Sequence, residues 1–291
     1  MDAYAISRSD VFDVRALLAA KRLPNELVLA ILDHARYWVE VRHEKAVLDA
    51  LVHDEHSLEF SAAYPYMVIP TTTSTHGPSS EVSKLREIEI ILVSHDQGWS
   101  TTGTRHTYQQ SSSFWEASIL RPIANDDVNH VPRLMTKFEE DRSRNGNYRS
   151  VESAAQAMFP RELYHLLRRP DQDMEPQRLH CREMIDLTMD EKDPNDKHLE
   201  ATQEGEHAWF LQCNVVARGV SLFHGEMVPR HHIIWSCKNH PRWVGNDGSG
   251  QGEGFVDAVK PGDCIVLWTR IKRQFWENHA YGVHVKHRYT I

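Results

Sequence analysis

Two short stretches of the chain combine acid–base groups with aromatic rings, and each lies next to a β-forming run. The first stretch is SHDQGW, in which His95 and Asp96 precede Trp99. A histidine beside a carboxylate can move a proton or polarise a carbonyl, and an indole ring can stack on a substrate. The same residues also suit a structured turn in which Asp96 accepts hydrogen bonds from backbone N–H groups and Trp99 seals the sandwich. The sequence leaves both interpretations open.

The second combination places an acid in one β-run and a base in another. Glu116 follows Trp115 in SFWEA, and Arg270 comes two residues after Trp268 in LWTR. Because neighbours in a strand point to opposite faces, Trp115 and Glu116 face apart, whereas Trp268 and Arg270 share a face. Arg270 is therefore a candidate clamp for a substrate carboxylate. The alternative is a buried Glu–Arg pair that braces the sheet, because a buried carboxylate needs a partner.

We predict a single ligand site from these stretches. Its expected catalytic residues are His95, Asp96, Glu116 and Arg270, and its expected substrate-binding residues are Trp99, Tyr108, Trp115, Trp268, Trp276 and Asn278. Confinement by aromatic rings together with a few hydrogen bonds suits cyclisation, isomerisation or dehydration of a largely apolar molecule. These reactions require no strong nucleophile, and the chain contains no GxSxG elbow that would supply one.

The motifs of bound cofactors are missing from the sequence. It contains neither GxGxxG after a strand nor GxxxxGK[ST], so nicotinamide, flavin and ATP chemistry have no support. His231 and His232 are neighbours in a β-run and point to opposite faces, so only one of them can share a metal site with His224. Without HxH, HExxH or two-histidine–carboxylate spacing, we expect no catalytic metal and no cofactor. A structural calcium ion bound by loop carboxylates is left open.

Four β-runs carry these residues. Ile88–Val93 and Phe114–Leu120 flank a polar and aromatic loop, and Cys264–Arg270 and Ala280–Tyr289 flank a basic and aromatic one. Alternating apolar and polar residues, as in the last run, are typical of a strand with one buried face. We therefore expect two strand pairs of one β-sandwich, with the loops after Val93 and Arg270 meeting over the ligand.

The N-terminal region has helical patterns instead. Apolar spacing predicts a helix over Val11–Lys21 with Ser9 or Asp10 as its cap. A second helix begins at Pro24, where Leu27 and Ile31 belong to one apolar stripe. A third is expected from about Glu44 to Leu51.

These patterns divide the chain into two parts. We expect an N-terminal helical cap over residues 1–60 and a mainly β body over residues 84–291, with charged loop insertions around 125–206. Ser57–Ser83 reads as a linker, and Gly245–Gly254 reads as a flexible loop.

Several motifs of the β-rich body recur in order in a family of fungal proteins that this chain resembles. They are SHDQGW, TY, SFWEA, LQCN, HHIIW, GDCIVLWTRI and FWEN. The resemblance implies a jelly-roll-like β-sandwich similar to galactose-binding modules, but no activity. The chain departs from the family at QSSSFWE and KRQFW, which fall in the expected ligand loops.

A shorter resemblance lies in the N-terminal region, where LPNELVLAIL is similar to the opening of an F-box. An F-box docks ubiquitin-ligase adaptors, so a functional one would imply such a partner. The residues that follow, HARYWVEVRHEKAVL, depart from the motif. A structural helical cap is the alternative interpretation.

Composition limits the class of protein. There are 41 acidic against 33 basic residues, which gives a net charge of -8 and disfavours a nucleic-acid partner. No apolar run approaches the roughly 20 residues that span a bilayer, and the N-terminus lacks a signal-peptide pattern, so we expect no membrane association. The widely spaced Cys181, Cys213, Cys237 and Cys264 indicate free thiols in a reducing cytosol, and hence a cytoplasmic location.

Two functions are compatible with these features. The first is a cofactor-independent cyclase or isomerase, pericyclase-like or lyase-like, that acts on a largely apolar metabolite of specialised metabolism. The second is a non-catalytic ligand-binding or F-box-like adaptor module. A deep pocket lined by aromatic rings would favour the enzyme. A shallow groove together with an exposed Leu23–Leu32 stripe would favour the adaptor.

Overall fold

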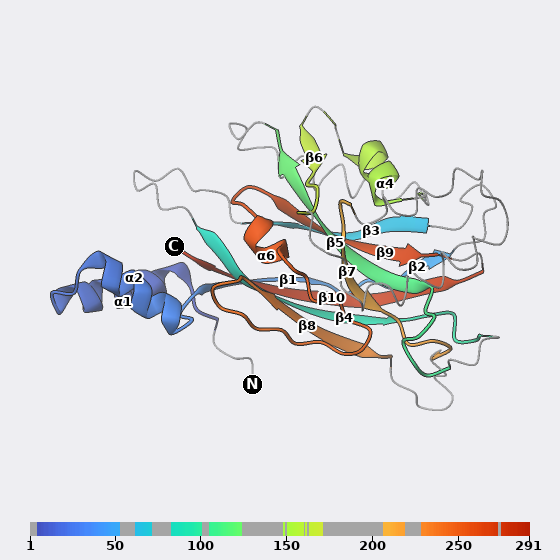
Figure 1. Cartoon of the computed structure of the whole chain (residues 1–291), viewed down its shortest axis with the longest axis horizontal. Coiled ribbons are helices and arrows are strands. Elements are labelled where there is room, and N and C mark those ends of the chain that lie inside the picture. The colour runs from blue at the N-terminus through green and yellow to red at the C-terminus, as the bar shows by residue number, and fades with distance from the viewer. Residues whose placement is uncertain are drawn as a thin grey trace.

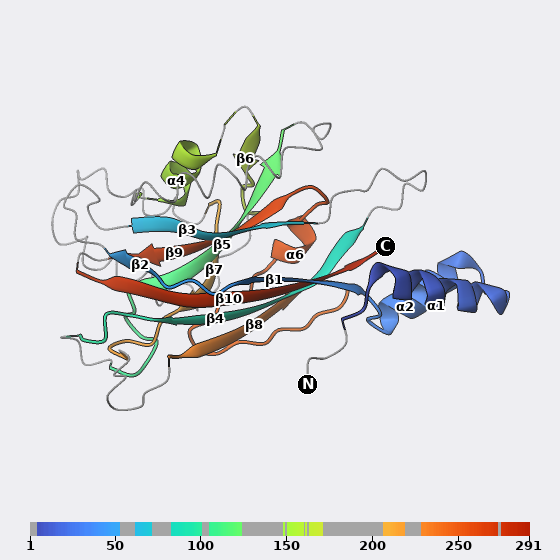
Figure 2. The same ribbon diagram turned by 180° about the vertical axis from the view of Figure 1, so that it is seen from behind.

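Two antiparallel sheets pack face to face in the computed structural model of the chain (Figures 1 and 2). The structure describes residues 5–52, 62–71, 83–100, 105–123, 148, 150–159, 161, 163–170, 206–218, 228–272 and 275–291. The expectation of a mainly β fold built as a β-sandwich is confirmed. Most of the charged segment 125–206, together with Cys181 and His224, lies outside the described residues.

Within the described part of the chain, each sheet has five strands. Sheet A contains β1 (Val39–Lys45), β10 (Glu277–Thr290), β4 (Lys84–His95) and β8 (Arg230–Ser236) in that order, with β2 (Asp49–Val52) also paired to β10. Sheet B contains β3 (Ala62–Pro70), β9 (Cys264–Ile271), β5 (Ser113–Pro122) and β6 (Tyr164–Leu166) in that order, with β7 (Trp209–Cys213) also paired to β5. The two central strands of each sheet therefore come from distant parts of the chain.

The expected strands exist, but their expected pairing is wrong. β4 pairs with β10 in sheet A, and β5 pairs with β9 in sheet B. The connections from β4 to β5 and from β9 to β10 therefore cross from one sheet to the other instead of forming hairpins. The apolar pattern of a run shows which of its residues are buried, but it does not choose the neighbouring strand.

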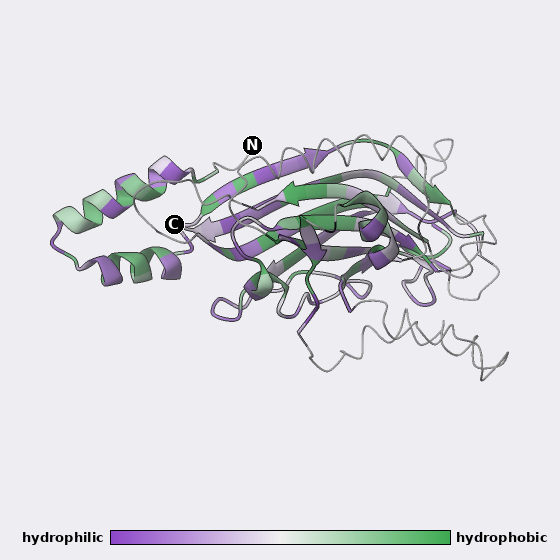
Figure 3. Ribbon diagram, turned by 90° about the horizontal axis from the view of Figure 1, so that it is seen from above, coloured by the Kyte–Doolittle hydropathy of each residue, from purple (hydrophilic) through white to green (hydrophobic). Residues whose placement is uncertain are grey.

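The core between the sheets is formed by inward-facing residues of both layers. In β4 the buried Ile88, Ile90 and Leu92 alternate with residues that face away from sheet B, among them Glu89. Figure 3 shows the same alternation of hydrophobic and hydrophilic residues along the strands. Trp115, from β5, packs its ring edge-on against Tyr66, with the ring centroids 5.2 Å apart. This side-chain layer holds the sheets together by removing apolar surface from water.

The first two helices extend from one end of the sandwich (Figures 1 and 3). α1 (Arg8–Ala20) is capped by Ser7 rather than by the expected Ser9 or Asp10, because Ser7 and Asp10 form a reciprocal capping box. α2 (Asn25–His34) has Pro24 at its N-cap. Val28 and Leu32 of α2 are buried in a cluster that includes the end of β10. Leu27 and Ile31 of the predicted stripe are 52% and 43% exposed.

Two local expectations were wrong. The segment Glu44–Leu51 contains the end of β1 and most of β2, so the region 1–60 contributes two strands to sheet A. β3 occupies part of the expected linker. In both cases long-range pairing overrides the local propensity of the residues. The glycine-rich segment 245–254 is a loop, and within it Gly250 N donates to Leu211 O of β7 at 3.0 Å.

Two shorter helices complete the described fold. α4 (Val151–Met158) packs on the outer face of sheet B, where it shares a buried cluster with Trp268. α6 (Phe255–Ala258) places Phe255 between the rings of Trp209 and Trp235 in the central core. Among the described residues, every helix is too short or too polar to cross a bilayer.

Candidate functional site

The loops that follow β4 and β9 lie together at one end of the sandwich. His95, the last residue of β4, pairs in register with His279 of β10, and the two imidazole rings stack with their centroids 4.7 Å apart. Glu277 N donates to Gln97 Oε1 at 3.4 Å. Pairing of β4 with β10 thus brings together two loops that are far apart in the sequence. We take this end, which we call the loop end, as the candidate site.

His95 lies beneath the surface of the loop end. Its Nδ1 contacts the backbone oxygen of Asp96, and its Nε2 lies 3.0 Å from the hydroxyl of Tyr281. Because a carbonyl only accepts, Nδ1 carries the proton and the Tyr281 hydroxyl donates to Nε2. Burial lowers the pKa of His95, and the charge of His279 acts in the same direction, against the hydrogen bond to Asp96 and the charge of Glu277. His95 is therefore held as a neutral imidazole.

His279 and Glu277 are the acid–base groups that a ligand can reach. His279 Nε2 lies 2.5 Å from Glu277 Oε2, and their side chains are 24% and 36% exposed. His95 is only 7% exposed and lies behind the ring of His279. A ligand at the loop end would therefore meet the His279–Glu277 pair first, with the ring of His95 stacked behind that of His279.

Asp96 holds the loop in shape. Its carboxylate is fully buried, and Oδ1 accepts from Gly98 N at 2.8 Å while Oδ2 accepts from Ala217 N at 2.6 Å. Burial raises the pKa of Asp96, while these backbone hydrogen bonds oppose that rise. The contacts match the Asp96 part of the structured-turn interpretation of SHDQGW, because both oxygens are used within the protein. Its other part is wrong, because Trp99 is exposed and does not seal the sandwich.

Two of the aromatic residues at this end are open to solvent. Trp99 is 56% exposed and Phe275, which the sequence analysis did not select, is 63% exposed. Phe275 adopts a φ of 67°. Trp276, by contrast, is 8% exposed and packs with Leu51 and Ile271.

Tyr108 lies between the loops and β7. It is half-buried and packs against Phe114, Phe210 and Cys213. Its ring centroid is 6.1 Å from that of His231. Tyr108 therefore contacts the body of the sandwich rather than the His279–Glu277 pair.

A buried polar network lies directly beneath the loop end, between the sheets. Trp115 Nε1 donates to Ser94 Oγ at 3.0 Å, and Ser94 Oγ donates to Asn214 Oδ1 at 2.7 Å. Asn214 Nδ2 donates to Asn278 Oδ1 at 3.0 Å, and Asn278 Nδ2 donates to Phe114 O at 2.9 Å. Satisfied buried networks of this kind rigidify the surrounding structure.

This network places two of the predicted substrate-binding residues, Trp115 and Asn278, inside the protein. Sequence reasoning missed its other members, Ser94 and Asn214. The signal that could have found Asn214 was a polar residue directly after an apolar β-run, in LQCN.

Glu116 and Arg270 have their side chains on the outer face of sheet B, although Arg270 is next to the end of β9. Each side chain is 1% exposed, and Arg270 Nη1 contacts Glu116 Oε2. Arg270 Nε also donates to Ala62 O at 3.2 Å. Trp268 faces the same way and packs against Phe159. The structure therefore does not bring the four predicted catalytic residues into one site, because His95 faces outward from sheet A.

Two surface hollows among the described residues lie away from the loop end. One of about 380 Å³ lies between α2 and the end of β10, and another of about 560 Å³ lies between the end of β8 and the turn before α6. None of the predicted site residues lines either hollow. Within the described part of the chain, no three histidine, cysteine or acidic side chains are placed to hold a metal ion.

The F-box-like start is only partly helical. α2 carries its LPNELVLAIL motif, and the residues that follow enter β1 instead of forming another helix. The exposed Leu27 and Ile31 leave an apolar face on α2, as an adaptor would require. Docking of a ubiquitin-ligase adaptor stays a prediction.

Comparison with family models, with curated proteins and with solved structures finds no match to this chain. The site is therefore interpreted from its own geometry.

Proposed function

We propose that this protein binds a small organic molecule at the loop end. The observation that carries the proposal is the exposure of Trp99 and Phe275 on the two loops that the Gln97–Glu277 hydrogen bond joins. Large aromatic rings this exposed are candidates for ligand contact when they lie beside convergent polar groups. The ligand we expect has an apolar face for the rings, and hydroxyl or carbonyl groups for Glu277 and His279.

The finer fold assignment belongs to the same proposal. We infer a jelly-roll-like sandwich with the helical pair as a cap, as the resemblance to galactose-binding modules implies. A ligand site in loops at one end of the sandwich agrees with that resemblance. The supporting observation is that strands far apart in the sequence pair at the centre of each sheet, β4 with β10 and β5 with β9.

A second candidate function, at the same site, is the cofactor-independent cyclase or isomerase. The observation that favours it is the reachable His279–Glu277 pair stacked on a neutral His95. Such a pair can take a proton from one carbon or oxygen of a bound molecule and return it to another. The pair is the part of the site that would distinguish catalysis from binding.

The test is native mass spectrometry of the purified protein, followed by identification of the released molecule. We expect a retained organic molecule, and at least a tenfold loss of affinity for it in Trp99→Ala and Phe275→Ala. Trp243→Ala is the matched control, because Trp243 is also exposed but lies in the hollow near α6. Equal affinity of all three variants and the parent protein would refute the loop-end site.

Incubation with the retained molecule distinguishes the binding function from the catalytic one. If the site is catalytic, His279→Gln binds the molecule but no longer converts it. If the site only binds, the parent protein returns the molecule unchanged after incubation, and His279→Gln alters affinity alone.

A further inference from the structure

The hollow between α2 and sheet A has an apolar wall and a polar floor. Its volume of about 380 Å³ lies in the range of about 300–1,000 Å³ that is usual for small-molecule sites. Leu29 and Leu32 of α2 line one side, and Tyr37 and Tyr289 contribute aromatic rings. Asp33 and Arg86 also line the hollow and supply its polar groups.

The carboxylate of Asp33 is already satisfied by the protein. Its Oδ1 accepts from Trp38 Nε1 at 2.9 Å. Its Oδ2 accepts from Arg86 Nη2 at 3.0 Å and lies 2.9 Å from His240 Nε2. A ligand therefore has little to gain from donating a hydrogen bond to Asp33.

Arg86 is different, because one of its donors has no acceptor. Its Nε is buried and has no hydrogen-bond partner among the described residues. Buried donors of this kind are rarely left unpaired, and such an exception calls for an explanation. The guanidinium of Arg86 is therefore not fully satisfied by the described residues, and a guanidinium binds a carboxylate more strongly than a neutral oxygen.

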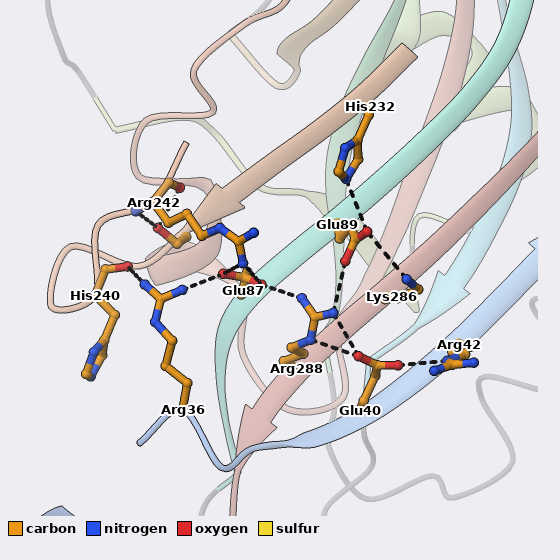
Figure 4. A network of polar contacts seen from close by, with 11 residues as sticks. Arg36, Glu40, Arg42, Glu87, Glu89, His232, His240, Arg242, Lys286 and Arg288 are labelled. Carbon is orange, nitrogen blue, oxygen red and sulfur yellow. Dashed lines mark hydrogen bonds and ion pairs between the residues drawn. The ribbon is translucent and has the colours of Figure 1, made fainter. Parts of the chain in front are cut away.

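The surroundings of the hollow carry a local excess of positive charge. Glu87, next to Arg86, is 1% exposed and is bonded by Arg36, Arg242 and Arg288 (Figure 4). Arg288 also pairs with Glu40 and Glu89, which contact Arg42 and Lys286 in turn. With the Arg86–Asp33 pair included, this described network has two more positive groups than carboxylates. Its positive groups are Arg36, Arg42, Arg86, Arg242, Lys286 and Arg288, and its carboxylates are Asp33, Glu40, Glu87 and Glu89. The chain as a whole has a net charge of -8, so this region stands out as a place for an anion.

We propose that this hollow binds a small apolar carboxylic acid, with its carboxylate on Arg86 and its apolar part between α2 and Tyr289. The unpaired Nε, the apolar wall and the excess positive charge each point to this class of ligand. The site is separate from the loop end, since His95 and Tyr289 lie toward opposite ends of the paired strands β4 and β10.

The test is calorimetric titration of the full chain with 1-naphthylacetate and with decanoate, each compared with its own amide. The acid and the amide have nearly the same size, so the comparison isolates the charge. We expect each acid to bind at least tenfold more tightly than its amide. Higher salt should weaken the binding of the acid and leave that of the amide unchanged.

Two variants locate the site. Arg86→Met should lower the affinity for the acid to that of the amide, and Arg230→Met, a change at an exposed arginine in β8, should have no effect. Ala30→Trp should block the hollow without removing the Arg86–Asp33 pair, because exposed Ala30 lines it. Leu17→Trp, on the exposed surface of α1, is its control.

Three results would each overturn the inference. One is equal affinity for acid and amide in both pairs. Another is unchanged acid binding in Ala30→Trp, a result that does not depend on the stability of Arg86→Met. The last is the absence of binding by both acids. Trp99→Ala should leave acid binding intact, so failure here and failure of the loop-end proposal are distinguishable.

Discussion

The imidazole rings of His95 and His279 lie nearly parallel, with their centroids 4.7 Å apart and their planes inclined by 14°. Each ring has a further partner, Tyr281 for His95 and Glu277 for His279. The contact joins the end of β4 to the start of β10 directly beneath the exposed aromatic residues. It is therefore the point at which the two loops of the candidate site are held together.

This stacking predicts a measurable coupling between the two histidines. A double-mutant cycle of His95→Ala and His279→Ala should give a coupling of about 1 kcal/mol in urea unfolding at pH 8. A cycle that pairs His95→Ala with His232→Ala, on the neighbouring strand β8, should be additive. Additivity of His95 and His279 at pH 8 would show that the stack contributes nothing.

Two other histidines predict that acid weakens the fold. Burial lowers the pKa of His231 and of His287 to about 4, with smaller contributions from the charges of Arg218 and His43. An unfolded histidine has a pKa near 6.5, so the unfolded chain takes up these protons first. Their stabilising effect is complete above pH 6.5 and is lost as the pH falls from 6.5 toward 4.

At pH 5 the loss should be on the order of 2 kcal/mol for each of the two histidines. The measurement is the free energy of unfolding in urea at pH 7.5 and pH 5. His287→Leu should reduce the difference between the two, because neither ring nitrogen of His287 has a hydrogen-bond partner among the described residues. His232→Leu, at a side chain that is 45% exposed, should leave the difference nearly unchanged. An unaltered difference in His287→Leu would contradict the prediction.

The buried ion pair on the outer face of sheet B predicts a stability effect rather than a binding effect. Glu116→Gln or Arg270→Met should each cost about 3–5 kcal/mol, because each leaves a buried charge without its partner. The double variant should cost clearly less than the sum of the two. Arg168→Met breaks the largely exposed pair with Glu206 and should cost less than about 1 kcal/mol.

The measurement for this pair is the midpoint of denaturant unfolding. If Arg270 instead clamps a substrate, Arg270→Met will lower ligand affinity while the midpoint stays unchanged. That outcome would restore the clamp interpretation.

Two glycines with left-handed backbones predict different costs of adding a methyl group. Gly262 has a φ of 90° and nothing within 4 Å of an added Cβ, so Gly262→Ala should cost about 1 kcal/mol through backbone strain alone. Gly252 has a φ of 64°, and an added Cβ would lie 2.0 Å from the Trp235 ring. Gly252→Ala should therefore cost about 1–3 kcal/mol more, from overpacking. Equal shifts of the two melting temperatures would refute the packing of this segment against β8.

The local pattern of the sequence located most of the elements that surround the candidate site. Alternation found β4, β5, β9 and β10, and helical spacing found α1 and α2, because these periods are properties of a single segment. Alternation also correctly placed Trp268 and Arg270 on one face of their strand. The local pattern could not predict which strands pair, because a strand with a buried face can belong to either sheet.

The site depends more strongly on long-range contacts. His95, Asp96, Glu116 and Arg270 resemble one another as candidates in the sequence, but their partners separate them into a stacked ring, a turn and a buried pair. The sequence does not mark Arg86 as a candidate, because a single charged residue in a β-run is common. Only the packing of α2 against β10 leaves its Nε buried beside a hollow. The sequence by itself determined which residues are turned inward or outward, and tertiary structure decided which of them meet, because alternation is local and pairing is not.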